Sequence, residues 1–229
     1  MVTLGKDLIT GQFLKREKKF TAFVRLGSRV TRVFLSQTGR LEEVLKVGTP
    51  VVLRPAPHHS KLPFEMLLAY DGPTPVIVDS RIANLVVGEA LEDHAIPSLP
   101  YYSMVVREKK VGNHRIDFLL RNHSRIFLEV KGCTLKVKSS IIFPDAPTER
   151  GREHLRLLSR LQSEGSKTMV IFLAMRSDVN SFKVNSAMDP EFAILLSEAV
   201  KGGTRIASFA TDFSDGRAKI GRRLRLFLN

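Results

Sequence analysis

Apolar and polar residues alternate in short runs over the first 80 residues, and turn residues rich in glycine separate the runs. Runs of this length between turn signals are typical of β-strands. The expected strands are Leu4–Thr10, Phe20–Leu26, Val30–Ser36, Pro50–Arg54, Phe64–Tyr70 and Pro75–Asp79, with one short helix at Leu41–Leu45. Several short strands at close spacing with a single helix predict a small OB-like β-barrel over residues 1–80.

After residue 80 the pattern alternates between helix and strand. Apolar stripes at helical spacing predict helices over Ile82–Leu91, from Thr148 to Gly165, and from Asp189 to Gly202. The expected strands are Tyr102–Glu108, Arg115–Leu120, Ile126–Lys131, Thr134–Ile142, Thr168–Ala174, Arg205–Phe209 and Arg222–Leu228. Helices interspersed among mixed strands predict a second domain over residues 81–229, of α/β (mixed α+β) class, with helices flanking a sheet.

The composition is that of a globular protein. The chain has 229 residues, of which 43% are hydrophobic, and this excludes a disordered protein. No apolar run approaches the roughly 20 residues of a membrane-spanning helix, and no signal peptide is recognisable. Cys133 is the single cysteine, which excludes a disulfide framework and indicates a reducing, cytoplasmic location.

The charge balance points to an acidic partner. The formal net charge is +13, and both predicted domains carry more basic than acidic residues. Such an excess favours nucleic acid as the partner, with a generally basic surface as the alternative.

Candidate chemistry lies in a predicted hairpin. Two apolar runs flank the polar residues Arg121–Arg125, and a turn centred on His123 places Asp117 directly opposite Glu129. Opposed side chains lie about 4.5–5.5 Å apart at Cβ, so the two carboxylates repel each other unless a cation lies between them. Lys131 lies on the same strand face as Glu129. The pattern predicts a Mg²⁺ (or Mn²⁺ or Ca²⁺) site with a catalytic lysine; the alternative is a solvated face with cross-strand ion pairs.

Basic residues elsewhere are candidate contacts to a nucleic-acid backbone. Arg40 follows Thr38-Gly39, where a glycine turn lets backbone and guanidinium approach a phosphate together. Arg150 and His154 share one face at a helix start, where free N–H groups favour anions; the alternative is a surface pairing with neighbouring glutamates. The full set is Lys15, Arg16, Lys18, Lys19, Thr38, Gly39, Arg40, Arg115, Arg150 and His154.

Four segments of the chain resemble the sugar fermentation stimulation protein A (SfsA) family: Gln37–Leu45, Arg115–Leu119, Glu129–Leu135 and Phe143–Leu155. The resemblance implies an OB-like domain followed by a PD-(D/E)xK nuclease-like domain, with DNA binding and a divalent-metal site. It also implies a metal ligand from the first core helix at Glu89, for which the alternative is an ordinary exposed glutamate.

The sequence therefore predicts a DNA-binding protein with a Mg²⁺-dependent nuclease site that hydrolyses phosphodiester bonds. A non-catalytic, regulatory DNA-binding protein on a nuclease-like scaffold is the main alternative. An RNA-binding module is a third interpretation, because OB-like barrels bind single-stranded nucleic acid of either kind.

Overall fold

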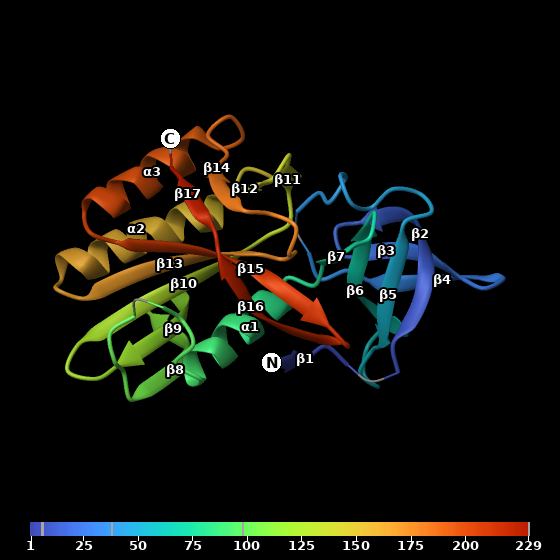
Figure 1. The fold of residues 1–229 in the computed structure, drawn as a ribbon, viewed down its shortest axis with the longest axis horizontal. Helices are drawn as coiled ribbons and strands as arrows, with labels where there is room; N and C mark the ends of the chain where they lie inside the picture. Colours follow the sequence, from blue (N-terminus) through green and yellow to red (C-terminus); the bar gives the residue numbers. More distant parts are fainter. Residues whose placement is uncertain (6, 38, 98, 229) are drawn as a thin grey trace.

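The structure is a computed structural model that describes residues 1–5, 7–37, 39–97 and 99–228. Figure 1 shows a β-barrel formed by the N-terminal part of the chain beside a larger α/β unit. The barrel and the α/β unit confirm the two fold types that the sequence predicts.

The barrel is a six-stranded sheet in the order β4-β3-β2-β5-β6-β7. A parallel pairing of Phe34 with Glu65 joins β4 to β6 and closes it. Alternate residues such as Val24, Val33 and Leu53 point inward and are fully buried. The strands are β2 (Ile9–Lys18), β3 (Thr21–Leu26), β4 (Arg29–Phe34), β5 (Pro50–Pro55), β6 (Phe64–Asp71) and β7 (Thr74–Ile77).

Two parts of the barrel differ from the prediction. Residues 11–18 lie between two expected strands in the sequence, but in the structure they belong to β2, which pairs with both β3 and β5. A Cβ at Gly11 would lie 2.5 Å from Cγ1 of Val24, so only glycine allows β2 to pass this close to β3. The helix expected at Leu41–Leu45 is a single turn, closed by a 2.8 Å bond from the Leu45 N–H to the Leu41 carbonyl.

The α/β domain is built on a seven-stranded sheet in the order β1-β16-β15-β13-β10-β9-β8. Its centre, β10, β13 and β15, is parallel, and the outer pairs are antiparallel. Residues 2–3 were expected in the barrel domain, but they form β1 at the open edge of β16. The strands are β1 (Val2–Thr3), β8 (Met104–Val111), β9 (His114–Arg121), β10 (Arg125–Cys133), β13 (Lys167–Ala174), β15 (Arg205–Ser214) and β16 (Arg217–Arg223).

Helices cover both faces of this sheet (Figure 1). Helix α1 (Arg81–Glu92) packs on one face, and α2 (Glu149–Ser163) and α3 (Pro190–Lys201) pack together on the other. The N-cap of α2 is the predicted one, because Oγ1 of Thr148 accepts the Gly151 N–H at 3.1 Å. The caps and stripes in the sequence therefore fix where the helices begin and which faces they bury.

A second, four-stranded sheet lies beside α2 and α3. Its order is β11-β12-β14-β17, with β11 (Lys136–Val137), β12 (Ser140–Phe143), β14 (Ser181–Val184) and β17 (Arg225–Phe227). The single strand expected over 134–142 is thus two short strands, and the last expected strand is divided between β16 and β17. Strand β12 leads directly into the loop that borders the functional site.

Polar contacts fix the barrel against the α/β domain. Arg176, whose side chain is fully buried, donates to Oδ2 of Asp71 on β6 at 2.6 Å and to Asp178 in its own loop. The Ile77 N–H at the end of β7 donates to the Met175 carbonyl at 2.8 Å. These contacts hold the two domains on either side of one cavity.

Candidate functional site

The hairpin of β9 and β10 pairs in the predicted register. Its paired residues run to Leu128 opposite Phe118. At the next residues the Asp117 side chain takes the place of a backbone partner for β10: its Oδ2 accepts a hydrogen bond from the Val130 N–H at 2.8 Å. Asp117 is therefore anchored to β10 beside Glu129, as the register predicts.

Glu129 and Lys131 extend from the central strand β10 into the same region. Oε1 of Glu129 accepts a hydrogen bond from Nζ of Lys131 at 2.8 Å and also contacts Nδ1 of His154. Oε2 of Glu129 is buried and has no hydrogen-bond partner among the described residues. A buried carboxylate oxygen without a partner is costly, and a bound cation or water would satisfy it.

The two carboxylates influence each other's ionisation. Burial, and then the negative charge of Glu129, raises the pKa of Asp117 to about 6. Burial also acts to raise the pKa of Glu129, but Lys131 and His154 more than offset it, so this pKa lies below its ordinary value. Two acids held together in a buried place are typical of functional sites, and a cation between them would relieve their repulsion.

Helix α1 brings an amide to this pair. Nδ2 of Asn84 donates to Oδ1 of Asp117 at 2.7 Å. The expected metal ligand Glu89 lies five residues further on, about 140° around the helix axis. Its carboxylate pairs with the N-terminal amine of Met1 and does not line the cavity. The expectation for Glu89 is therefore corrected: α1 presents Asn84 to the site.

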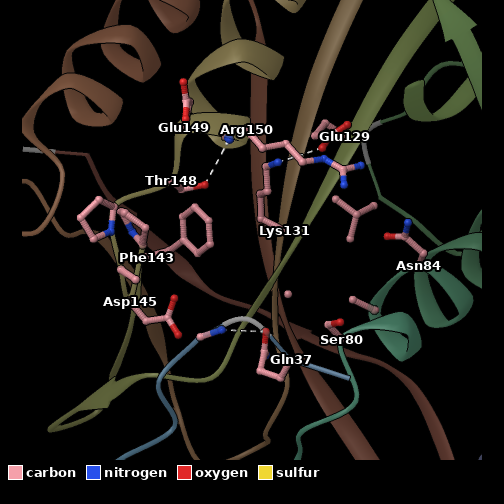
Figure 2. Close-up of a pocket in the computed structure, with 18 of the residues that line it drawn as sticks. Gln37, Ser80, Asn84, Glu129, Lys131, Phe143, Asp145, Thr148, Glu149 and Arg150 are labelled. Carbon is pink, nitrogen blue, oxygen red and sulfur yellow. Dashed lines mark hydrogen bonds and ion pairs between the residues drawn. The ribbon is translucent and has the colours of Figure 1, made fainter. Parts of the chain in front are cut away.

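These side chains form one wall of a cavity of about 540 Å³ between the barrel and the α/β domain. Figure 2 shows Glu129 and Lys131 on one side and Phe143 and Asp145 on the other, with Ser80 and Asn84 from the start of α1. The cavity is polar on the α/β side and is bordered by the barrel at Lys19, Gln37 and Gly39. It thus lies where a ligand would touch both domains.

The first turn of α2 borders the cavity as well. Thr148, Glu149, Arg150 and Gly151 line it, and the exposed Arg150 side chain extends beside Lys131 in Figure 2. A helix start presents free N–H groups and a partial positive charge. Arg150 therefore lies where the sequence predicted a phosphate contact.

A loop of the barrel meets the loop after β12 of the α/β domain at Gly39. A Cβ on Gly39 would lie 1.9 Å from Oδ2 of Asp145, so any side chain here would displace the Asp145 carboxylate. The backbone N–H of Arg40 bonds to Asp145, and burial raises the pKa of Asp145. The Arg40 side chain is exposed, whereas Thr38 lies outside the described residues.

Arg16 has a structural part in this loop. Its guanidinium donates to the carbonyls of Gln37 and Gly39, both at 2.6 Å, and to that of Lys19. Its donors are directed at the backbone, so the expected nucleic-acid contact for Arg16 is corrected to a role in holding the Gln37–Arg40 segment.

The other lysines of the basic run lie on or next to β2. The Lys15 ammonium is 5.0 Å from the centroid of the Phe23 ring, on the outer surface of the barrel. Lys18 is exposed at the end of β2, and Lys19 lines the cavity and an adjoining hollow of about 780 Å³. Lys15, Lys19 and Arg40 border this hollow, so the basic surface continues from the barrel to the cavity.

Two predicted phosphate contacts lie elsewhere. His154 is 3% exposed and contacts Glu129, because residue 154 is on the face of α2 that packs on the sheet. The expectation of a surface phosphate contact at His154 is therefore corrected. Arg115 is exposed near the β8–β9 turn, 3.8 Å from Glu108, and does not line the cavity.

The donor set fits a hard divalent cation. Within the described ranges no group of three His, Cys, Asp or Glu side chains converges as a metal cage. Asp117 and the unpartnered Oε2 of Glu129 supply carboxylate oxygens beside a cavity open to water. Mg²⁺ in proteins commonly has one or two carboxylate ligands, and water and phosphate complete its shell. Asp117 and Glu129 match this pattern.

Asn84 is not predicted from the sequence. For Asp145 the sequence favours helix capping, with a carboxylate beside the metal ligands as the alternative. Asn84 lies on a helix distant in sequence from the hairpin, and its neighbours carry no signal for a site. Asp145 is within Phe143–Pro147, whose two prolines indicate a fixed loop. In the structure Asp145 lines the cavity from this loop.

Comparisons with known proteins agree with this architecture. Residues 14–78 match the profile "SfsA N-terminal OB domain", and residues 81–217 match "Sugar fermentation stimulation protein RE domain". The chain belongs to the sugar fermentation stimulation protein (SfsA) family. The predicted membership is confirmed, as is the order of an OB barrel followed by a nuclease-like α/β domain.

Family relatives match along nearly their whole length. The sugar fermentation stimulation protein homolog of Caldanaerobacter subterraneus subsp. tengcongensis is 34% identical, over 98% of this chain and 99% of its own. That of Thermoanaerobacter sp. (strain X514) is 36% identical, over 99% and 100%. The solved structure of Pyrococcus furiosus SfsA in complex with Ca²⁺ superposes with a TM-score of 0.91 at 27% identity, covering 99% of this chain and 100% of that one. None of the described helices is long and apolar enough to span a membrane.

Proposed function

We propose that this SfsA-family protein is a divalent-metal-dependent nuclease that hydrolyses phosphodiester bonds in DNA. The observation that carries the proposal is the buried, unpartnered Oε2 of Glu129, which lies with Asp117 and Lys131 at the wall of a polar cavity. Two acids and a lysine in such a place match the needs of metal-assisted hydrolysis.

Each residue has a distinct part in the proposed chemistry. Asp117 and Glu129 would hold Mg²⁺, Mn²⁺ or Ca²⁺, and a cation there would acidify a bound water and neutralise phosphate charge. Asn84 and the Val130 N–H orient Asp117, while Lys131 is close enough to Glu129 to stabilise negative charge beside it. The relative solved with Ca²⁺ supports a divalent cation in this family.

The phosphate would be bound by groups at the start of α2, beside Lys131. Arg150 and the first-turn N–H groups of α2 are the donors nearest to that position. The net charge of +13 and the basic hollow that adjoins the cavity at Lys19 and Gly39 support a polyanion as substrate.

The test is cleavage of labelled single- and double-stranded DNA in Mg²⁺ or Mn²⁺. Asp117→Asn and Lys131→Ala should each lower the cleavage rate about 10²–10⁴-fold, because they remove charge at the reacting centre. Glu153→Gln, at an exposed position next to His154 on α2, is the matched control and should retain the rate. Calorimetry should show that Asp117→Asn also weakens cation binding; unchanged cleavage and cation affinity in this variant would refute the assignment.

A non-catalytic DNA-binding protein is the second candidate. It is favoured by Asn84, which occupies the helix position next to Asp117 where another acid would strengthen metal binding. This alternative predicts binding that weakens steeply with salt and no cleavage in either metal, with variants at Asp117 binding normally. Competition between matched DNA and RNA would separate it from an RNA-binding module.

A further inference from the structure

A second hollow, of about 520 Å³, lies on the outer surface of the barrel. The β2–β3 turn at Phe20, the outer face of β4 at Arg32 and Phe34, and the β5–β6 loop at Lys61 form its sides. In OB barrels this outer face of the second and third strands, between these two loops, is where oligonucleotides bind. The position alone suggests a ligand, and the side chains define its chemistry.

Two aromatic rings form the apolar part of the hollow. Phe20 is 42% exposed, and its ring centroid lies 6.1 Å from that of Phe34 at an interplanar angle of 31°. The two rings are tilted, so they do not stack fully on each other and leave ring surface accessible. Inward-facing neighbours such as Ala22 and Val33 are fully buried. The barrel core therefore does not require these two outer rings.

The charges around the rings are mainly positive. The ammonium of Lys19 lies 5.7 Å from the Phe20 centroid, and the guanidinium of Arg81 lies 5.7 Å from that of Phe34. Arg54 and Arg81 both bond to Glu65, the acid in the hollow, and to the buried Asp79, so these four charges balance. Arg32 and Lys61, which line the hollow, and Lys19 supply the positive excess. A ligand that fits is flat and aromatic and carries negative charge, which describes a nucleobase on a phosphate backbone.

The hollow lies next to the cavity at Asp117 and Glu129, called the metal cavity below because of the proposed cation. Lys19 lines the cavity while the next residue, Phe20, lines the hollow. On the other side Ser80 lines the cavity while Arg81 lies over the ring of Phe34. A strand with one base at Phe20 would therefore pass Lys19 on its way to Asp117.

We infer that the Phe20–Phe34 hollow binds one unpaired base of the DNA strand that enters the metal cavity, so that the substrate has a single-stranded segment. This inference rests on the proposed function and names its substrate class. A base stacked between protein side chains cannot at the same time stack and pair in a duplex, so double-stranded DNA without an unpaired segment does not use this hollow.

The first test uses the absence of tryptophan from the chain. Phe20→Trp introduces a single tryptophan. Its emission is followed while oligothymidylate of about 12 nucleotides, within the length an OB fold covers, is added without metal. Stacking of thymine should quench the emission, and an abasic oligomer of equal length and charge should not. Equal quenching by both oligomers would show that only the phosphates are read and would overturn the inference.

The second test compares two exposed phenylalanines. Phe227 on β17 is 48% exposed, and the ammonium of Lys183 lies 5.5 Å from the centroid of the Phe227 ring. The surroundings of Phe227 therefore resemble those of Phe20, but Phe227 lies in the α/β domain. Phe20→Ala should weaken oligothymidylate binding about tenfold, the effect of losing one stacked base. Phe227→Ala should leave the affinity for oligothymidylate unchanged. Phe20→Ala should leave the affinity for a blunt duplex unchanged.

The outcomes separate this inference from the nuclease proposal. Binding is measured without metal, so a protein that never cleaves still gives a result. Equal affinities of Phe20→Ala and Phe227→Ala for oligothymidylate would overturn the inference even if the protein cleaves DNA. Tighter binding of oligouridylate than of oligothymidylate, with the same sensitivity to Phe20→Ala, would assign the hollow to RNA and overturn its assignment to DNA.

Discussion

Replacement of Gly39 by alanine tests how the barrel loop packs against the Asp145 loop of the α/β domain. The substitution adds one Cβ atom at this position. Its Cβ would lie 1.9 Å from Oδ2 of Asp145, and that oxygen must move by roughly 1 Å or more to reach normal contact. The movement overpacks the junction and weakens the bond from the Arg40 N–H to a carboxylate. Together these effects predict a loss of about 2–4 kcal/mol in the free energy of unfolding.

A double-mutant cycle isolates the cause. Urea unfolding is measured for Gly39→Ala, Asp145→Ala and the double variant. Asp145→Ala removes the oxygen that the new Cβ would contact. In the Asp145→Ala protein, Gly39→Ala should therefore lower the free energy of unfolding by less than about 1 kcal/mol. A cost that is the same in both backgrounds would show that Asp145 is not the reason for glycine at this position, and would refute the reasoning.

Two further predictions concern stability. Arg176→Met should destabilise the protein by about 2 kcal/mol at neutral pH, because Arg176, against the opposing effect of burial, holds the pKa of Asp178 well below its ordinary value. A carboxyl group whose pKa is lowered by folding stabilises the fold at pH values above its unfolded pKa of about 4, and this stabilisation is lost as the pH falls below that value. The difference in free energy of unfolding between the two proteins, measured in urea, should therefore be smaller at about pH 3 than at neutral pH. A difference that stays constant would contradict the prediction. Thr148→Ala should cost about 1 kcal/mol, because it removes the 3.1 Å cap bond to the Gly151 N–H. Ser163→Ala, in the exposed last turn of the same helix, is its control, and equal losses would exclude a capping effect.

Local patterns in the sequence account for much of the fold and for the centre of the site. The hairpin register follows from two apolar strands around a polar turn, and it places Asp117 and Glu129 side by side because side chains alternate along a strand. The caps at Thr148 and Asp189 fix the starts of α2 and α3, because their side chains satisfy N–H groups within the same turn. Each of these features depends on residues close together in the sequence.

What only the tertiary structure decided depends on contacts between distant segments. Asn84 rather than Glu89 meets Asp117, because the rotation of α1 is set by the apolar side chains that it buries against the sheet. His154 is turned inward to Glu129 by the packing of α2, and Arg16 bonds to backbone carbonyls of a loop more than twenty residues away. A sequence pattern gives the face of one element, but the partner of that face is set by the packing of all elements together. For this reason the proximity of Asp117 and Glu129 could be predicted from the sequence, whereas the groups that orient these two carboxylates could not.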